Sequence, residues 1–118
     1  MFGRKARIRE LSRWAAKKAN CIMDEADKLG DAQDIGRLAF LIWSETNMLP
    51  HEGRNAKHEN EKGVKQIQEG VYKLNKKIND YNNSYGQKID TANMFKLIHS
   101  TARISEALGY TDVEYFID

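Results

Sequence analysis

The chain has 118 residues, of which 41% are hydrophobic and 31% charged, and its net charge is +2. This length is typical of one domain, and the composition is that of a folded globular protein rather than a disordered one. The longest apolar run, residues 38–43, is too short to cross a bilayer, and charges interrupt the stretch where a signal peptide would be apolar. We therefore expect one domain over residues 1–118, a cytoplasmic location and, with Cys21 as the single cysteine, no internal disulfide.

Charge is distributed very unevenly along the chain. The first twenty residues hold seven basic residues and one glutamate, a net charge of +6. The rest of the chain holds twelve basic and sixteen acidic residues, a net charge of −4. Such a separation is typical of a contact surface for nucleic acid, an anionic membrane or an acidic protein.

The basic segment coincides with the first predicted helix. Apolar residues recur every three or four positions from Ile8 to Leu29, which predicts a helix over about residues 4–29 that ends at Gly30. Lys5, Arg9, Arg13 and Lys17, spaced by four, form a line along the flank away from this apolar stripe, and Arg7 and Lys18 lie on the other side, near Trp14. The candidate binding residues are Lys5, Arg7, Arg9, Arg13, Trp14, Lys17 and Lys18.

A second helix is predicted between Asp31 and Pro50. Asp31 is a candidate N-cap, and Asp34 lies in the first turn, where a negative charge favours the helix dipole. The middle of this segment is apolar almost all round, so we expect the second helix to be the most buried element.

The segment Pro50–Asn60 is polar and predicts a loop, after which a regular heptad begins. Its apolar positions are Val64, Ile67, Val71, Leu74, Ile78 and Tyr81. Gly63 and Gly70 lie beside this seam, which predicts close approach of a neighbouring helix. A homo-oligomer formed through the third helix stays open at this point, because a heptad seam can pack within one chain or between chains.

A turn at residues 82–86 separates this helix from a fourth, which Asp90 or Thr91 would cap and Gly109 would close. Thr111 and Glu114 have the spacing of a capping box and predict a short terminal helix. The expected fold is all-α, a single-domain bundle or compact array of four main helices plus a short C-terminal helix.

Residues 102–116 resemble the helix-turn-helix of bacterial transcription factors of the AraC type, on the pattern Gly-Tyr-x-Asp-x-x-Tyr-Phe that begins at Gly109. The resemblance implies DNA binding by the helix that follows the turn. That helix would carry Asp112 and Glu114 and no basic residue to meet phosphates or guanine edges. We interpret the segment as a packing motif that closes the bundle.

No motif points to catalysis or to a metal. The chain has no phosphate-binding glycine loop and no Cys-x-x-Cys pair, and the two His-Glu pairs, at His51 and His58, lack zinc-protease spacing. The cluster of Asp24, Glu25 and Asp27 is interpreted as a solvated acidic face, with pairing to basic residues of another copy left open. We predict a protein that is not an enzyme, with no catalytic residue, no metal site and no cofactor.

The function predicted from these features is a small binding or regulatory protein. It would dock through its basic helix onto nucleic acid, independently of sequence, or onto a nucleic-acid-handling protein. The alternative is an accessory or inhibitory protein, such as a phage-encoded antagonist of host defence, that binds an acidic protein surface. An anionic membrane surface is the third choice, with no integral membrane association.

Overall fold

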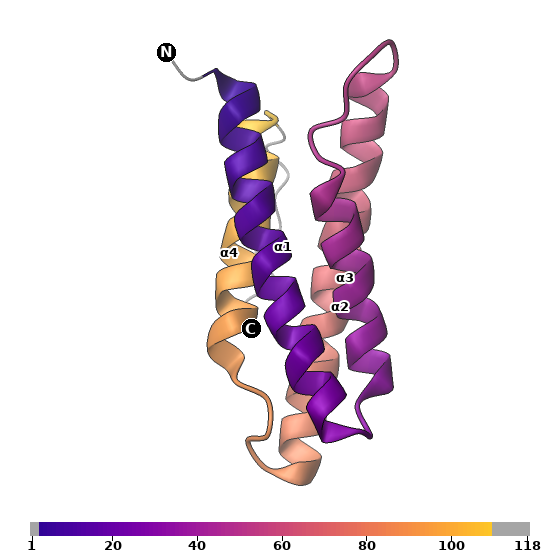
Figure 1. Cartoon of the computed structure of the whole chain (residues 1–118), viewed down its shortest axis with the longest axis vertical. Helices are drawn as coiled ribbons and strands as arrows, with labels where there is room; N and C mark the ends of the chain where they lie inside the picture. The colour runs from indigo at the N-terminus through magenta and orange to yellow at the C-terminus, as the bar shows by residue number, and fades with distance from the viewer. Residues whose placement is uncertain (1–2, 110–118) are drawn as a thin grey trace.

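The computed structural model describes residues 3–109, apart from the side chain of Arg4. It contains four helices: α1 (Arg4–Leu29), α2 (Gln33–Asn47), α3 (Ala56–Tyr85) and α4 (Thr91–Ala107). They run alternately up and down and form a four-helix bundle in which α1 and α3 each pack against α2 and α4 (Figure 1). The predicted all-α bundle is confirmed, whereas the predicted short terminal helix, at residues 111–117, lies outside the described residues.

Small side chains form most of the buried stripe of α1. Ala15, Ala19 and Ala26 are each at most 3% exposed, and Ile22 is fully buried among them. Without long side chains between them, helix axes approach closely. This packing holds α1 against both of its neighbours, so its orientation about its own axis is fixed.

The heptad seam of α3 lies in the same core. Its members Val64, Ile67, Val71, Leu74 and Ile78 are buried within the chain. Gly70 faces α2, because its Cβ would lie 3.0 Å from Cγ1 of Ile42, and Gly63 faces the segment just after α2, because its Cβ would lie 3.4 Å from Cδ2 of Leu49. The predicted close approach is thereby confirmed. Because these five seam residues are buried within one chain, they offer no exposed apolar surface for a homo-oligomer formed through the third helix.

The ends of α3 differ from the prediction, and two buried asparagines explain the difference. The helix begins at Ala56, inside the predicted loop, and runs to Tyr85, through all but the last residue of the predicted turn. Asn60 accepts a hydrogen bond from the backbone N–H of His51 at 2.7 Å. Asn82 accepts from the backbone N–H groups of two residues in the next loop and donates to a carbonyl there. Residues that favour turns in the sequence therefore serve here as helical anchors for the adjacent loops.

The α1–α2 turn is fastened to α3 rather than capped. Gly30 ends α1 with a φ of 79°, as predicted, but α2 follows Ala32 and has no side-chain cap. The carboxylate of Asp31 instead accepts a hydrogen bond of 2.6 Å from the hydroxyl of Tyr81, which raises the pKa of that tyrosine to about 12. The predicted cap at Asp31 is therefore wrong, whereas the predicted cap at Asp90 of α4 is confirmed by its hydrogen bond to Ala92.

Helix α2 is not the most buried element, contrary to the prediction. Phe40 is 51% exposed and Leu41 is 58% exposed, although both lie in its apolar middle. A helix of a four-helix bundle keeps one face toward solvent, so an almost wholly apolar segment must expose some of its apolar residues. Helix α4 carries more buried residues, among them Ala102, Ile104 and Ser105 of the helix-turn-helix-like segment. The part of that segment beyond Gly109 lies outside the described residues.

The glycine contacts predict opposite effects for two substitutions. Gly70→Leu places a side chain against Ile42 and should lower the free energy of unfolding by about 1–3 kcal/mol, because a packed helix interface cannot absorb the added volume. Gly36→Ala should raise it by up to about 1 kcal/mol, because its Cβ would lie at an ordinary 3.8 Å from that of Ala26 and alanine favours the helix. Urea unfolding followed by circular dichroism measures both. Equal effects of the two substitutions would contradict the close α2–α3 packing.

The buried amide of Asn82 gives a second prediction. Asn82→Ala leaves two backbone N–H groups and one carbonyl of the α3–α4 loop without their partner, and should cost about 1–3 kcal/mol of the free energy of unfolding. The neighbouring exposed Asn83→Ala is the control and should change stability little. If both variants unfold at the same urea concentration, the anchor role of Asn82 is wrong.

Candidate binding face on helix α1

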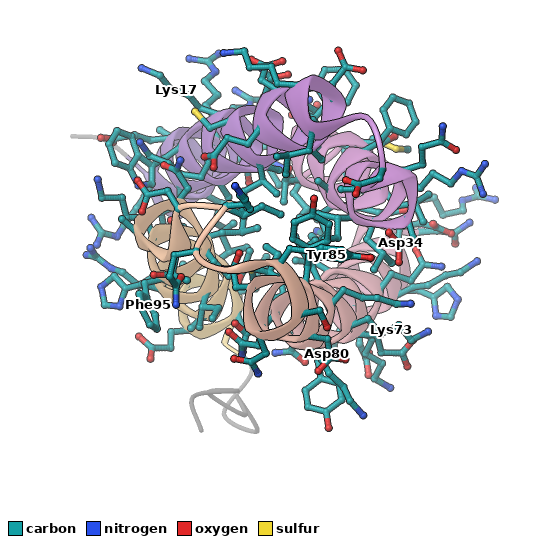
Figure 2. All side chains as sticks on the ribbon, turned by 90° about the horizontal axis from the view of Figure 1, so that it is seen from below. Lys17, Asp34, Lys73, Asp80, Tyr85 and Phe95 are labelled. Atoms are coloured by element: carbon teal, nitrogen blue, oxygen red, sulfur yellow. The ribbon has the colours of Figure 1, made fainter. Side chains whose placement is uncertain are left out.

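All seven predicted binding residues lie on α1, but the bundle divides them among three lines along the helix. Lys5 and Arg9 face the α2–α3 loop, whereas Arg13 and Lys17 lie on the outside of the bundle. In the view along the bundle, Lys17 points away from the other helices, on the side opposite Lys73 of α3 (Figure 2). The remaining three residues lie on the flank toward α4. That third group is Arg7, Trp14 and Lys18.

Lys5 and Arg9 both form ion pairs with the carboxylate of Glu52. Lys5 Nζ lies 2.8 Å from Glu52 Oε1, and the Arg9 guanidinium donates to the same oxygen. The hydrogen bond and charge of Lys5, together with the charge of Arg9, hold the pKa of the Glu52 carboxyl below its usual range. This clamp joins α1 to the α2–α3 loop and leaves only one net positive charge on the three residues. The predicted line from Lys5 to Lys17 therefore has two parts: Lys5 and Arg9 are paired with Glu52, whereas Arg13 and Lys17 are not.

Trp14 and Lys18 form a unit on the α4 flank. The Lys18 ammonium lies 4.4 Å from the centre of the Trp14 ring, within range of a cation–π interaction. The ring is 47% exposed, so one part of it is open to a partner. Arg7 lies two helical turns before Trp14 on the same line.

Contacts near the C-terminal end of α1 show which neighbouring helix the flank with Trp14 and Lys18 faces. Seven residues after Lys18, Glu25 accepts hydrogen bonds from the backbone N–H of Asp90 and from the side-chain amide of Asn93 on α4. Residues seven apart lie on the same side of a helix. The line that carries Trp14 therefore follows the α1–α4 boundary.

Two cations of α4 continue this surface, and the sequence prediction did not include them. Because α1 and α4 are antiparallel and Glu25 contacts Asn93, Trp14, eleven residues before Glu25, lies within about one residue of the level of Arg103, ten residues after Asn93 (Figure 1). Arg103 and Lys96 are exposed and seven apart, and Lys96 follows Asn93, which contacts α1, by one helical turn. That spacing is visible in the sequence, but only the pairing of α1 with α4 places the two residues beside the basic helix.

Arg13 and Lys17 have no ion-pair partner within residues 3–109. The ion pairs there join Lys5 and Arg9 to Glu52, and two further lysines to carboxylates of α2 and α3. Both side chains are exposed, and they lie four residues apart, one turn along a helix whose position is fixed by its buried alanines. This face is a rigid array of cations that can bind phosphates or carboxylates.

The described residues give little basis for a metal site or for a membrane-spanning helix. Residues 3–109 contain no group of three or more His, Cys, Asp or Glu side chains that could hold a metal ion. In the same range, no helix is long and apolar enough to cross a membrane. Comparisons with protein families, with curated proteins and with solved structures found no match to the chain.

The clamp predicts a titration that can be followed directly. In the folded protein the Glu52 carboxyl should titrate below the usual range, so the stability that the clamp contributes is present above that range and is lost as the pH falls through the lowered pKa. Lys5→Met with Arg9→Met should return the pKa of Glu52 to its usual value, as measured by carboxyl ¹³C NMR. Lys17→Met is the matched control and should leave it lowered. An unchanged titration in the double variant would show that the clamp does not form in solution.

Proposed function

We propose that the protein binds nucleic acid without sequence preference, with the phosphates contacting the outer line of α1 and its α4 flank. One observation carries this proposal. The exposed cations Arg13 and Lys17 have no ion-pair partner in the described structure, and they lie beside Trp14, which is half-exposed. Phosphate contacts supply affinity without reading sequence, and an exposed aromatic ring stacks on bases of any kind. The binding surface consists of Arg7, Arg13, Trp14, Lys17 and Lys18, with Lys96 and Arg103 as additions from α4.

Two features favour nucleic acid over an anionic membrane. A membrane-surface helix inserts an apolar face beside its cations. The apolar face of the basic half of α1 is instead buried in the bundle, and Trp14 is the large apolar side chain exposed there. The exposed Phe40 and Leu41 lie on α2, beside the acidic half of α1.

A salt titration with a charge-reversal variant tests the proposal. The six cations of this surface form no ion pair within residues 3–109, and they predict that affinity for a random-sequence DNA duplex falls with salt with a log–log slope of about −5.4. Arg13→Glu with Lys17→Glu should weaken binding at least tenfold at about 0.1 M salt and reduce the size of the slope by about 2. Fluorescence anisotropy of a labelled duplex measures both quantities, and a labelled single strand measures the contribution of Trp14.

Matched controls separate the face from net charge. Lys73→Glu with Lys76→Glu makes the same change of charge on the exposed side of α3 and should leave affinity close to that of the wild type. Glu52→Gln releases Lys5 and Arg9 from the clamp and should strengthen binding. The proposal fails if the wild-type protein binds no nucleic acid at low salt, or if the two double variants weaken binding equally. An acidic protein partner would then be the function to examine.

A further inference from the structure

The outermost line of α1 changes sign halfway along its length. Its residues are separated by steps of 4, 3, 4 and 3, the spacing of one helical face, and all of them are exposed. The members of this line, which we call the outer stripe, are Arg13, Lys17, Asn20, Asp24 and Asp27. Two cations stand on the N-terminal side of an asparagine and two carboxylates on its C-terminal side.

The stripe is complementary to itself when turned end over end. Arg13 and Asp27 lie about 21 Å apart along the axis, and Lys17 and Asp24 about 10 Å apart, at 1.5 Å per residue. Both pairs are centred on Asn20. If a second α1 lies antiparallel across the first, Arg13 of each copy meets Asp27 of the other, and Lys17 of each meets Asp24 of the other. This arrangement has a two-fold axis at Asn20, the symmetry of the commonest dimers.

The described part of the chain gives these four charges no ion-pair partner. None of the four charged side chains takes part in an ion pair within residues 3–109. Within each half of the stripe, like charges lie three or four residues apart, which weakly destabilises a helix. Local stability therefore gives no reason for the arrangement, whereas a partner with the reverse order does.

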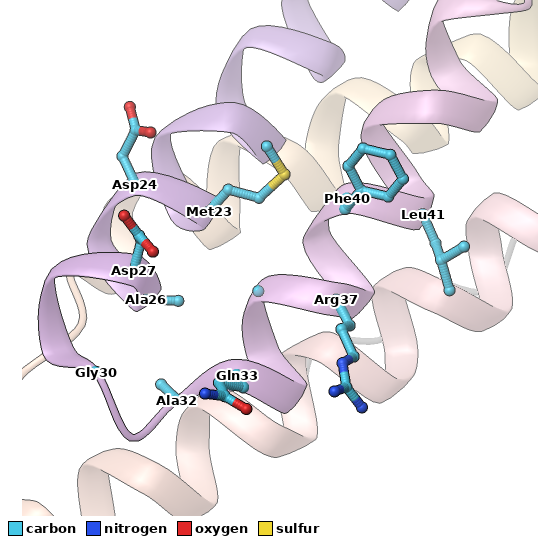
Figure 3. A pocket seen from close by; sticks show the side chains of 11 residues that line it. Met23, Asp24, Ala26, Asp27, Gly30, Ala32, Gln33, Arg37, Phe40 and Leu41 are labelled. Carbon is cyan, nitrogen blue, oxygen red and sulfur yellow. The ribbon is translucent and has the colours of Figure 1, made fainter.

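An exposed apolar surface adjoins the acidic half of the stripe. A groove of about 890 Å³ runs between α1 and α2, and its lining includes Met23, Asp27, Phe40 and Leu41. The Met23 side chain extends from α1 toward the ring of Phe40 on α2 (Figure 3). More than half of the surface of Phe40 and of Leu41 is open to solvent. Surface ion pairs alone contribute little to association, so this apolar area is the part that a partner would gain most by covering.

Phe40 lies close to the centre of the outer stripe. Gly36 of α2 faces Ala26 of α1, with 3.8 Å between the Cβ of Ala26 and the position a Cβ would take at Gly36. Because the two helices are antiparallel, Phe40, four residues later, lies at the level of Ile22, two residues from Asn20. In a two-fold pair of α1–α2 faces, the Phe40 rings of the two copies therefore come together beside the axis.

We propose that this face binds a second copy of the same chain, with the two α1 helices antiparallel and the exposed side chains of α2 covered beside them. The dimer goes beyond the proposed nucleic-acid function and does not depend on it. It does use Arg13 and Lys17, so a phosphate backbone and a second copy compete for the same two cations.

Reciprocal charge reversal provides the decisive experiment. One variant carries Arg13→Glu and Lys17→Glu, which makes the stripe wholly acidic; a second carries Asp24→Lys and Asp27→Lys, which makes it wholly basic. Each alone should be monomeric in sedimentation velocity, because like charges face each other across the axis. An equimolar mixture should restore the dimer, and so should a single chain with all four changes, because its stripe is again complementary to itself. Circular dichroism confirms that each exposed-site variant is folded.

Further measurements complete the test with the wild-type protein. It should dimerise in a concentration-dependent way, less at about 0.5 M than at about 0.05 M salt, since salt screens exposed charges. Phe40→Gln should weaken the dimer without changing any charge. A monomeric wild type at low salt and high concentration overturns the proposal, and so do reversal variants that remain dimeric or a mixture that stays monomeric.

The two proposals fail separately. The variant Phe40→Gln weakens the dimer and keeps every charge of the nucleic-acid face, so it reports phosphate binding apart from dimerisation. If it binds a duplex while the wild type sediments as a monomer in all conditions, only the dimer is wrong. If the wild type dimerises and neither protein binds nucleic acid, only the proposed function is wrong.

Discussion

The structure depends on the alanine stripe that packs α1 against α2 and α4. Ala15, Ala19 and Ala26 bring the backbone of α1 close to both neighbours, and Gly36 on α2 has no side chain to separate the helices there. Since a helix packed on two sides cannot rotate about its axis, the direction of every charged residue on its outer surface is fixed. The N-terminal charge is therefore a patterned surface. On α2, by contrast, the solvent-facing side carries apolar side chains, Phe40 and Leu41, that the core does not cover.

Most of the helix boundaries follow from local chemistry, and so they were predictable. Gly30 ends α1 because glycine adopts a positive φ without strain, and Asp90 begins α4 because its carboxylate satisfies a free backbone N–H. The errors arose where a side chain acts across the fold. Asn82 favours a turn by its local preference, yet inside α3 it satisfies the next loop, and Asp31 favours a cap, yet it accepts a hydrogen bond from Tyr81. Tertiary hydrogen bonds outweigh local preference at these positions.

The candidate site shows the same limit. Helical spacing is sufficient to place Arg13 and Lys17 on the outside of α1, since it requires only the apolar stripe as a reference. It does not reveal that Glu52, 43 residues after Arg9, neutralises much of the N-terminal turn. Nor does it reveal that α4 contributes Arg103 at the level of Trp14. Both facts depend on which elements are neighbours, and a single sequence leaves that pairing open.

The two proposed uses of α1 are linked by the cations they share. A dimer that pairs Arg13 and Lys17 with carboxylates removes two of the six positive charges of the nucleic-acid face, so each binding event weakens the other by the same factor. At high protein concentration a larger fraction of the chains would be dimers in which Arg13 and Lys17 are covered. Dilution, or a high local phosphate concentration, would release monomers with these cations exposed. Salt would weaken both equilibria, and because the dimer competes for the same cations, nucleic-acid occupancy would rise less steeply with protein concentration than it would for a chain that stays monomeric. The outer stripe places like charges three or four residues apart in each of its halves, an arrangement consistent with selection for such intermolecular pairing rather than for the stability of the helix.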